Sequence, residues 1–455
     1  MTRWLWTTAA ASAVAALACV PSLPKGPVPD AMLFDPTFQP VVHDGWVEVH
    51  APQPTSLLIN PTTGHIDFSL AKINLVSDCS TSVMPLPADC AFDTFLQSLD
   101  GFPTVTPAQA PASAALDPTT ITPGSGNVVV VGAKSGQPVT DLLTGFEPLG
   151  NYITLRPPHW TVGEFYWAAV RGYANGVKSA TGNQVVASPV MFLLKQETSL
   201  TCGATDANID PNCPAYALLK QQQSDDDAAQ SLLQLEPIRQ SLLQAAAWDI
   251  IAAAGIPKDE VAVLWGFPIH SNSVAELDPS PVANLVPKVT APNQITVAVQ
   301  GPVDAASVSA FVRQKQFGSV LVMDLTAANG GDLVSGLPSV SASYAAGNIV
   351  ITADAAFAPG HQIGLFFTNA IHDVPGAAGR PLVPSPVSKL LTLPYPLLTS
   401  DNHSALLSVG DSDAMMLESG RQQLAKLFDM QVFGALTGVS RDNIVYCYAF
   451  TAVAP

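Results

Sequence analysis

Four oxygen-bearing side chains occupy alternate positions of one short segment of the chain. They are Asp206, Asn208, Asp210 and Asn212. Carboxylate and amide oxygens are the hard ligands that calcium takes in proteins. An EF-hand calcium loop, however, has glycine at its sixth position, where this segment has Pro211, and it closes with a glutamate that is missing here. The segment therefore indicates either a structural calcium site or a loop of Asx turns, and the turns are favoured.

Motifs of the common catalytic classes are missing from the sequence. There is no Gly-x-Ser-x-Gly elbow for a lipase or esterase, no phosphate-binding glycine loop and no His-Glu-x-x-His zinc motif. The eight histidines are scattered, and no two of them stand two or four positions apart. We therefore expect a non-enzymatic protein with no catalytic residues and no cofactor other than the calcium considered above.

The cysteines form two short-range pairs and a remainder. Cys79 and Cys90 bracket a proline-rich stretch, and Cys202 and Cys213 bracket the oxygen-rich segment. In an exported chain these spacings predict two local disulfides. They do not match the close pairs that bind zinc. Cys447 lies in a segment with strand periodicity, and we expect it to be a small core residue.

The first 18 residues have the pattern of an export signal. Arg3 supplies a positive start, and the apolar run 5–17 is too short to span a bilayer, which needs about 20 apolar residues. The run ends Ala16-Leu17-Ala18-Cys19, which resembles a bacterial lipobox, although that pattern usually has leucine where Ala16 stands. We predict a signal peptide over 1–18, lipidation of Cys19 and anchoring in the cell envelope at the outer membrane. Plain secretion and an uncleaved anchor are the alternatives.

The chain repeats itself. Residues 150–189 align without a gap to residues 347–386, at an offset of 197 (347 − 150), and their glycines and Ser-Pro pairs coincide. The match continues from Leu235-Glu236-Pro237-Ile238-Arg239 to Leu417-Glu418-Ser419-Gly420-Arg421 at an offset of 182 (417 − 235). Copy one therefore carries 15 extra residues (197 − 182), which include the Cys202–Cys213 segment. Because Glu236…Arg239 and Glu418…Arg421 recur, we interpret both pairs as structural.

Hydrophobic periodicity outlines the repeated unit. In copy one it predicts a strand near 151–155, a second strand with Tyr166, Ala168 and Val170 on one face, and a third around 185–194. A helix follows over roughly 237–254, with Pro237 in its first turn, and then a final strand over 261–267. Ser224 and the three aspartates after it have the composition of a solvated helix start. We divide the chain into the signal peptide 1–18, an N-terminal region 19–99 that packs on module one, module one (100–270), a linker (271–287) and module two (288–455).

Three motifs of each copy resemble the bacterial Ig-like domain of S-layer and other envelope proteins. In copy one they are Asp117-Pro118, Gly163-Glu164-Phe165-Tyr166 and Gly182-Asn183; copy two has Gly379-Arg380 at the last position. A related version occurs in envelope lipoproteins and in the non-catalytic N-terminal region of some extracellular bacterial lipases. The resemblance covers roughly residues 100–455. It implies a mostly β fold, with two tandem Ig-like β-sandwich modules, each with an inserted α-helix, and no catalytic residues to transfer.

Composition narrows the choice of partners. The chain has 455 residues and a net charge of −17, and an acidic surface of this kind repels the phosphates of nucleic acids. Trp160 and Trp167 could stack on a sugar, although core packing is favoured. We expect an envelope protein or glycan as partner, a membrane contact through the lipid anchor, and no nucleic acid. The alternative function is that of an accessory to an exported lipase or esterase.

Overall fold

The structure is a computed structural model of the chain. It describes residues 47–49, 55–71, 86–148, 151–220, 224–275, 288–291, 293–311, 318–329, 336–374, 379–406, 409–429, 434 and 437–452. The expected signal peptide 1–18, the lipidation candidate Cys19 and the disulfide candidate Cys79 lie outside the described residues.

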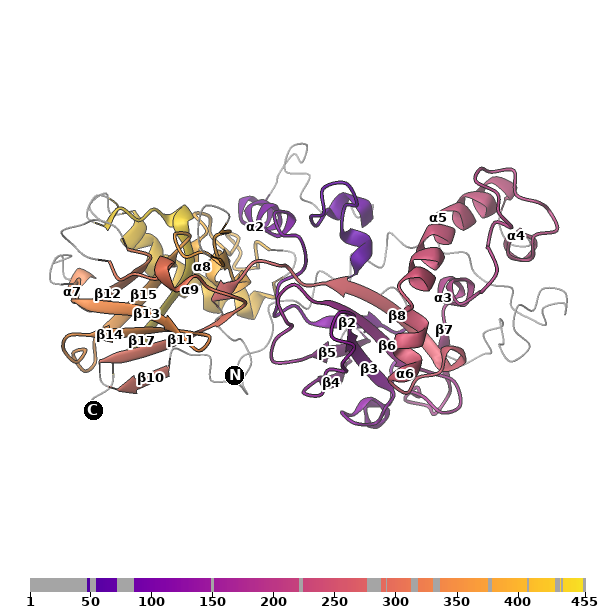
Figure 1. Ribbon diagram of the computed structural model, residues 1–455, viewed down its shortest axis with the longest axis horizontal. Coiled ribbons are helices and arrows are strands. Elements are labelled where there is room, and N and C mark those ends of the chain that lie inside the picture. Colours follow the sequence, from indigo (N-terminus) through magenta and orange to yellow (C-terminus); the bar gives the residue numbers. More distant parts are fainter. Residues whose placement is uncertain are drawn as a thin grey trace.

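The first half of the chain contains two three-stranded antiparallel sheets (Figure 1). One has the order β2-β5-β4, formed by β2 (Ala108–Pro111), β5 (Tyr152–Arg156) and β4 (Leu143–Glu147). The other has the order β3-β6-β8, formed by β3 (Val128–Gly132), β6 (Phe165–Arg171) and β8 (Val261–Pro268). The α-helices of this half are α2 (Pro87–Gln97), α3 (Pro189–Leu194), α4 (Pro214–Leu219), α5 (Asp225–Gln244) and α6 (Ala247–Ala253).

The second half repeats this topology. Strands β11 (Gln294–Gln300), β14 (Asn348–Ala353) and β13 (Val340–Ala345) pair as β2, β5 and β4 do, with β10 (Lys288–Ala291) added on β11. Strands β12 (Val320–Asp324), β15 (Gln362–Thr368) and β17 (Ile444–Thr451) pair as β3, β6 and β8 do. The α-helices are α7 (Leu325–Asn329), α8 (Pro386–Thr392) and α9 (Asp411–Phe428).

The register of the strands agrees with the sequence offsets. Tyr166 on β6 faces Phe267 on β8, and Ile363 on β15 faces Phe450 on β17. These partners differ by 197 (363 − 166) and 183 (450 − 267), which are the offsets of the aligned segments. The internal repeat is therefore a repeat of one fold.

Each half also opens with a short strand in a parallel pair. β1 (Val47–Val49) pairs with β7 (Val185–Ala187), and β9 (Val274–Ala275) pairs with β16 (Val383–Pro384). Two boundaries expected from the sequence therefore move. The region 19–99 contributes the first strand of module one, and the linker 271–287 contains the first strand of module two. From here on, module one denotes the described residues from Val47 to Pro268, and module two those from Val274 to Ala452.

A layer of helices covers one sheet of each module. In module two, Leu365 and Phe367 of β15 share an apolar cluster with β11 and β14. Phe366, which points the other way, packs in a second cluster with Leu424 and Leu427 of α9. The β3-β6-β8 sheet of module one is likewise covered on both faces, because all seven residues 261–267 of β8 are buried. The protein is a mixed fold, 30% helical and 28% strand, which does not support the expected mostly β class.

Two helices differ from the elements expected along this stretch. Residues 189–194 form α3 rather than the end of a strand, because the Ser188 hydroxyl accepts from the Met191 N–H and Pro189 stands in the first turn. The helix expected over 237–254 begins earlier, after Ser224, so Pro237 lies inside α5 instead of at its start. It is interrupted at Ala246, whose φ of 50° is left-handed, and resumes as α6.

Short 3-10 helices complete the described elements: η2 (Ser56–Leu58), η3 (Phe68–Ala71), η4 (Pro118–Ile121), η5 (Lys258–Glu260), η6 (Ala305–Ser307) and η7 (Arg441–Asn443). Asp117 caps η4 and Asp304 caps η6, each by accepting from the N–H two residues on. The same acidic cap thus occurs in both modules.

Replacing Tyr446 by phenylalanine is expected to raise the free energy of unfolding by about 1–3 kcal/mol. The Tyr446 ring stacks on Phe367 with 4.8 Å between centroids, but its buried hydroxyl has no hydrogen-bond partner among the described residues. The substitution keeps the ring and removes the unsatisfied group. Module one has Val263 at this position (446 − 183), so the repeat does not require the hydroxyl. Denaturant unfolding measures the change, and a loss of stability would show that the hydroxyl has a partner.

Candidate functional site

A buried ion pair on α5 lies next to the oxygen-rich loop. The Arg239 guanidinium donates to both oxygens of the Glu236 carboxylate, from Nη2 at 2.6 Å and from Nε at 3.0 Å. The side chains are 6% and 10% exposed, respectively. Glu236 also accepts from the Gln240 amide at 2.8 Å and from the Leu200 N–H at 2.8 Å. The helix therefore holds the backbone of the segment that follows α3.

Arg239 also binds the backbone of the segment that follows α3, through its remaining nitrogen, Nη1. Nη1 of Arg239 donates to the carbonyl oxygens of Gln196 and Glu197, at 3.2 Å and 3.0 Å. A guanidinium can form these bonds together with the bidentate pair, because its five N–H donors lie in one plane. The pair is thus a two-sided anchor: Arg239 binds the start of the segment and Glu236 binds Leu200.

Module two contains the same anchor on α9. Glu418 accepts from Arg421 at 2.6 Å and 2.7 Å, from the Gln422 amide at 2.9 Å and from the Leu397 N–H at 2.8 Å. Arg421 donates to the Leu393 carbonyl at 3.4 Å. Leu397 corresponds to Leu200 at the offset of 197 (397 − 200). The interpretation of both pairs as structural agrees with these contacts, since the carboxylates are buried and their oxygens are occupied.

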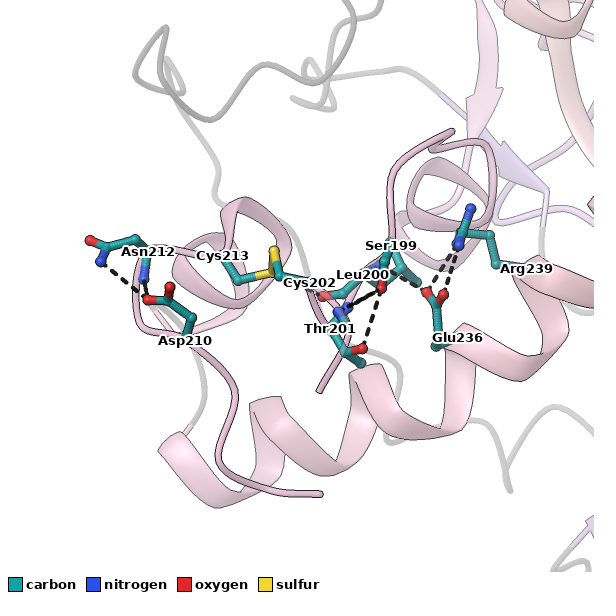
Figure 2. Close-up of a disulfide and its surroundings, with 10 residues drawn as sticks. Ser199, Leu200, Thr201, Cys202, Asp210, Asn212, Cys213, Glu236 and Arg239 are labelled. Atoms are coloured by element: carbon teal, nitrogen blue, oxygen red, sulfur yellow. Dashed lines mark hydrogen bonds and ion pairs between the residues drawn. A yellow bond between two sulfur atoms is a disulfide. The ribbon is translucent and has the colours of Figure 1, made fainter. Parts of the chain in front are cut away.

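The disulfide-bounded loop of module one follows this anchor directly. Cys202 and Cys213 are joined in a disulfide, and Cys202 stands two residues after the anchored Leu200. Figure 2 shows the disulfide beside Ser199–Thr201, with Glu236 and Arg239 on the helix below. Cys213 is 2% exposed and stands at the N-cap position of α4, whose Leu218 and Leu219 are buried in the core of module one. The loop is therefore attached at both ends to buried structure.

The four calcium candidates are exposed and form turns. The Asp206 carboxylate accepts from the Asn208 N–H at 2.9 Å. The Asp210 carboxylate accepts from the N–H of Asn212 at 2.8 Å and from its side-chain amide at 3.1 Å. These are Asx turns, the interpretation that the sequence favoured. In the part of the chain that the structure describes, no group of three or more His, Cys, Asp or Glu side chains gathers as a metal site. A calcium site made partly of asparagines stays a prediction.

Two further cysteines, Cys90 and Cys447, lie among the described residues. Cys90 is disulfide-bonded, while its expected partner Cys79 lies outside the described residues. Cys447 is free and fully buried, and burial raises the pKa of its thiol to about 12. A thiol with such a pKa is a poor nucleophile at neutral pH.

The aromatic residues considered for sugar stacking belong to the core. Trp160 is 1% exposed and Trp167 is 5% exposed. The Trp160 ring packs 4.8 Å from Tyr166 and 5.1 Å from Phe267, and its indole N–H donates to the Thr106 carbonyl at 2.5 Å. Neither tryptophan can serve as a sugar platform without unfolding.

None of the described helices has the length and apolar character needed to cross a bilayer.

The Glu236 anchor makes stability depend on pH. Burial raises the pKa of Glu236, but bonds from Arg239, Leu200 and Gln240 outweigh it and lower the pKa to about 2. Because the pKa of Glu236 is lower in the folded state than in the unfolded state, where it is about 4.3, the ionised carboxylate stabilises the fold at pH values above 4.3. This stabilisation is lost as the pH falls from 4.3 toward 2. We expect the melting temperature to fall across this window, and Glu236→Gln to reduce the slope. An equal slope in both proteins would contradict the assignment. Asp413 has the opposite effect at higher pH. Because burial raises its folded-state pKa to about 6, its ionisation lowers stability as the pH rises toward 6.

Comparisons with known proteins give no family. No family model matches the chain, and no curated protein matches it. Among solved structures, the chain is similar to the crystal structure of the S-layer protein rSbsC(31-844), with 13% identity and a TM-score of 0.17. The match covers 43% of this chain and 21% of that chain, so the chain spans about a fifth of that protein. A likeness of this quality supports no conclusion about fold or function.

Proposed function

We propose that the protein is a non-enzymatic lipoprotein of the cell envelope. Its tandem modules, of the bacterial Ig-like type, act as a framework that presents the Cys202–Cys213 loop to an envelope protein or glycan. The observation that carries the proposal is a difference between two copies of one fold. Both copies have the buried glutamate–arginine anchor, and only copy one has a disulfide-closed loop attached to it.

A binding role is supported by how the polar groups of the two copies are used. In each anchor the carboxylate oxygens accept four hydrogen bonds from the chain itself, and the two side chains are a tenth exposed or less. Such a group has no free oxygen for a substrate, and its duplication indicates framework. The loop has the opposite character, because Asp206, Asn208, Asp210 and Asn212 are exposed. Residues of this type on a rigid scaffold are common in binding surfaces.

The position of the loop also supports presentation. In Figure 1, α4, which begins directly after Cys213, is the labelled helix farthest from module two. A partner could therefore reach the loop without displacing either sheet.

The envelope location is tested with a fatty-acid label. Cells expressing the full-length chain are grown with a palmitate analogue, and the wild type is compared with Cys19→Ala. We expect label and membrane association in the wild type and neither in the variant. Label in both proteins would place the modification elsewhere, and label in neither would make the protein a secreted one. Recovery of an exported lipase or esterase with the wild-type protein would favour the accessory function instead.

A further inference from the structure

The connection between the two modules is bonded along its whole length. Only residues 269–273 separate β8 from β9. On the side of module one, the Phe102 N–H donates to the Pro268 carbonyl at 2.9 Å, and the His270 N–H donates to the Phe102 carbonyl at 3.1 Å. The fit is tight here, since a Cβ on Gly101 would lie 2.6 Å from the His270 nitrogen. The first part of the connection therefore belongs to module one.

Its last part is bonded to module two in the same way. The Ser273 hydroxyl donates to the Pro302 carbonyl at 2.6 Å, and the Val383 N–H donates to the Ser273 carbonyl at 3.0 Å. A Cβ on Gly301 would lie 2.5 Å from the Ser273 hydroxyl. Hydrogen bonds thus hold both ends of the connection, and only residues 271 and 272 lie between them.

Charged groups from both modules meet on Ser271. From module one, Asp100 accepts from the Ser271 N–H at 2.8 Å and from its hydroxyl. From module two, Arg380 donates from Nη1 to the Ser271 hydroxyl at 2.6 Å and from Nη2 to its carbonyl at 2.9 Å. Nε of Arg380 donates to Asp373 at 2.9 Å, and that carboxylate is 4% exposed. We call this chain of contacts, Asp100–Ser271–Arg380–Asp373, the clasp.

An apolar contact accompanies the clasp. Leu390 and Leu393 at α8, together with Leu417 of α9, belong to the same apolar cluster as the core of module one, not to the two clusters of module two. The Lys389 ammonium stands 5.9 Å from the ring centroid of Phe95 on α2. Figure 1 shows α2 between the sheets of module one and helix α8. Helix α2 and the core of module one therefore pack against helices α8 and α9 of module two.

The repeat shows that the clasp arginine is not part of the framework. Arg380 aligns with Asn183 in module one (380 − 183 = 197). Asn183 bonds only within its own turn, where its amide donates to the Thr181 hydroxyl at 3.0 Å. Both residues close a turn by bonds to its first residue, which is Ser179 in module one and Asp373 in module two, and the turn of module two is three residues longer (7 − 4). What Arg380 adds is a bond to the Asp373 carboxylate and the pair of bonds to Ser271.

We infer that Arg380 locks the two modules at one angle, so that they move as a single rigid body. Domains joined by a short polar interface are expected to move relative to one another. Here Arg380 bonds Ser271 of the connection to the buried Asp373 carboxylate of module two, which restrains the hinge. The inference does not depend on the proposed function, since it concerns the geometry of any task that the two modules share.

Distances between two spin labels test the clasp in the full-length protein. Labels on Gln137→Cys and Ser343→Cys report on module one and module two, because both positions are exposed. We expect a narrow distance distribution in the wild type and a broader one in Arg380→Asn, which installs the module-one residue. The matched control Asn183→Ala removes a turn contact without touching the junction, and its distribution should equal that of the wild type.

Two results would overturn the clasp. One is a distribution in Arg380→Asn that is as narrow as the wild type, and the other is a wild type that is already as broad as the variant. If Arg380→Asn does not fold, Ser271→Ala carries the test, because it removes the hydroxyl from both of its contacts and leaves the turn intact. An unchanged width in Ser271→Ala would then overturn the inference.

Discussion

Replacing Arg239 by alanine is expected to lower the free energy of unfolding by about 3–5 kcal/mol, because it leaves the Glu236 carboxylate buried without its counter-ion. The loss also frees the backbone that precedes the disulfide loop, since Arg239 binds the Gln196 and Glu197 carbonyls. Arg421→Ala should have a similar effect in module two, where the same contacts recur. Denaturant unfolding at neutral pH measures both.

The matched control is an exposed ion pair near the same helix. Glu197 pairs with Lys258 at 3.3 Å, and its side chain is 86% exposed. Glu197→Ala should therefore change stability by about 0–1 kcal/mol. The double variant Glu236→Gln with Arg239→Met should recover part of the loss, because it removes the stranded charge. If Arg239→Ala lost no more than Glu197→Ala, the anchor would not be the framework element that the repeat indicates.

Removing the disulfide is expected to cost about 2–4 kcal/mol and to loosen the loop. Cys202 and Cys213 are 11 positions apart, and Cys213 is buried at the start of α4. In a protein with both cysteines replaced by alanine, the amides of α4 should exchange faster with solvent, while those of β6 and β8 keep their protection.

Module two supplies the reference for that experiment. The segment between α8 and α9 has the anchor and no disulfide, so its exchange should be equal in the two proteins. Unchanged exchange at α4 would mean that packing of Leu218 and Leu219 alone holds the loop. The disulfide would then have no part in presenting it.

The sequence was sufficient for the repeat and for several strands. The offset of 197 ties Tyr166 to Ile363, and the structure pairs both with the final strand of their module. That result was predictable because strand periodicity and the turn glycines survive in both copies. The acidic helix start at Ser224 was predictable for a similar reason, as a capping hydroxyl followed by aspartates is a local signal.

Other elements depend on contacts that no local pattern carries. Strand β9 has two residues, so its place in the module-two sheet comes from its partners β11 and β16. The proportion of helix was underestimated because α3 and α8 are short and begin at a Ser-Pro step within apolar runs that also suit a strand. The sheets β3-β6-β8 and β12-β15-β17 are apolar on both faces because helices cover the face that does not meet the other sheet. Alternation of apolar and polar residues indicates only one buried face, so it does not predict this second layer.

The candidate site was only partly predictable. The spacing of Glu236 and Arg239 indicated a pair on one helix face, but the bond to Leu200, which links the pair to the loop, joins positions 36 residues apart. The clasp was missed, although a signal existed: among the turn positions at which the two copies differ, Asn183 of module one is replaced by the charged Arg380 in module two. A charged residue that replaces a neutral one at an aligned position of a repeat indicates a contact outside the repeated unit.

The central claim, that module one presents its disulfide loop to an envelope partner, is tested most directly by site-specific photo-crosslinking in the native host. A photoreactive amino acid is placed at Asn212, which is exposed in the loop, and in a second strain at Ser343, which is exposed on β13 of module two. We expect one discrete crosslinked species from position 212 that is weak or missing from position 343. Equal crosslinking from both positions, or a species from position 343 alone, would contradict the claim.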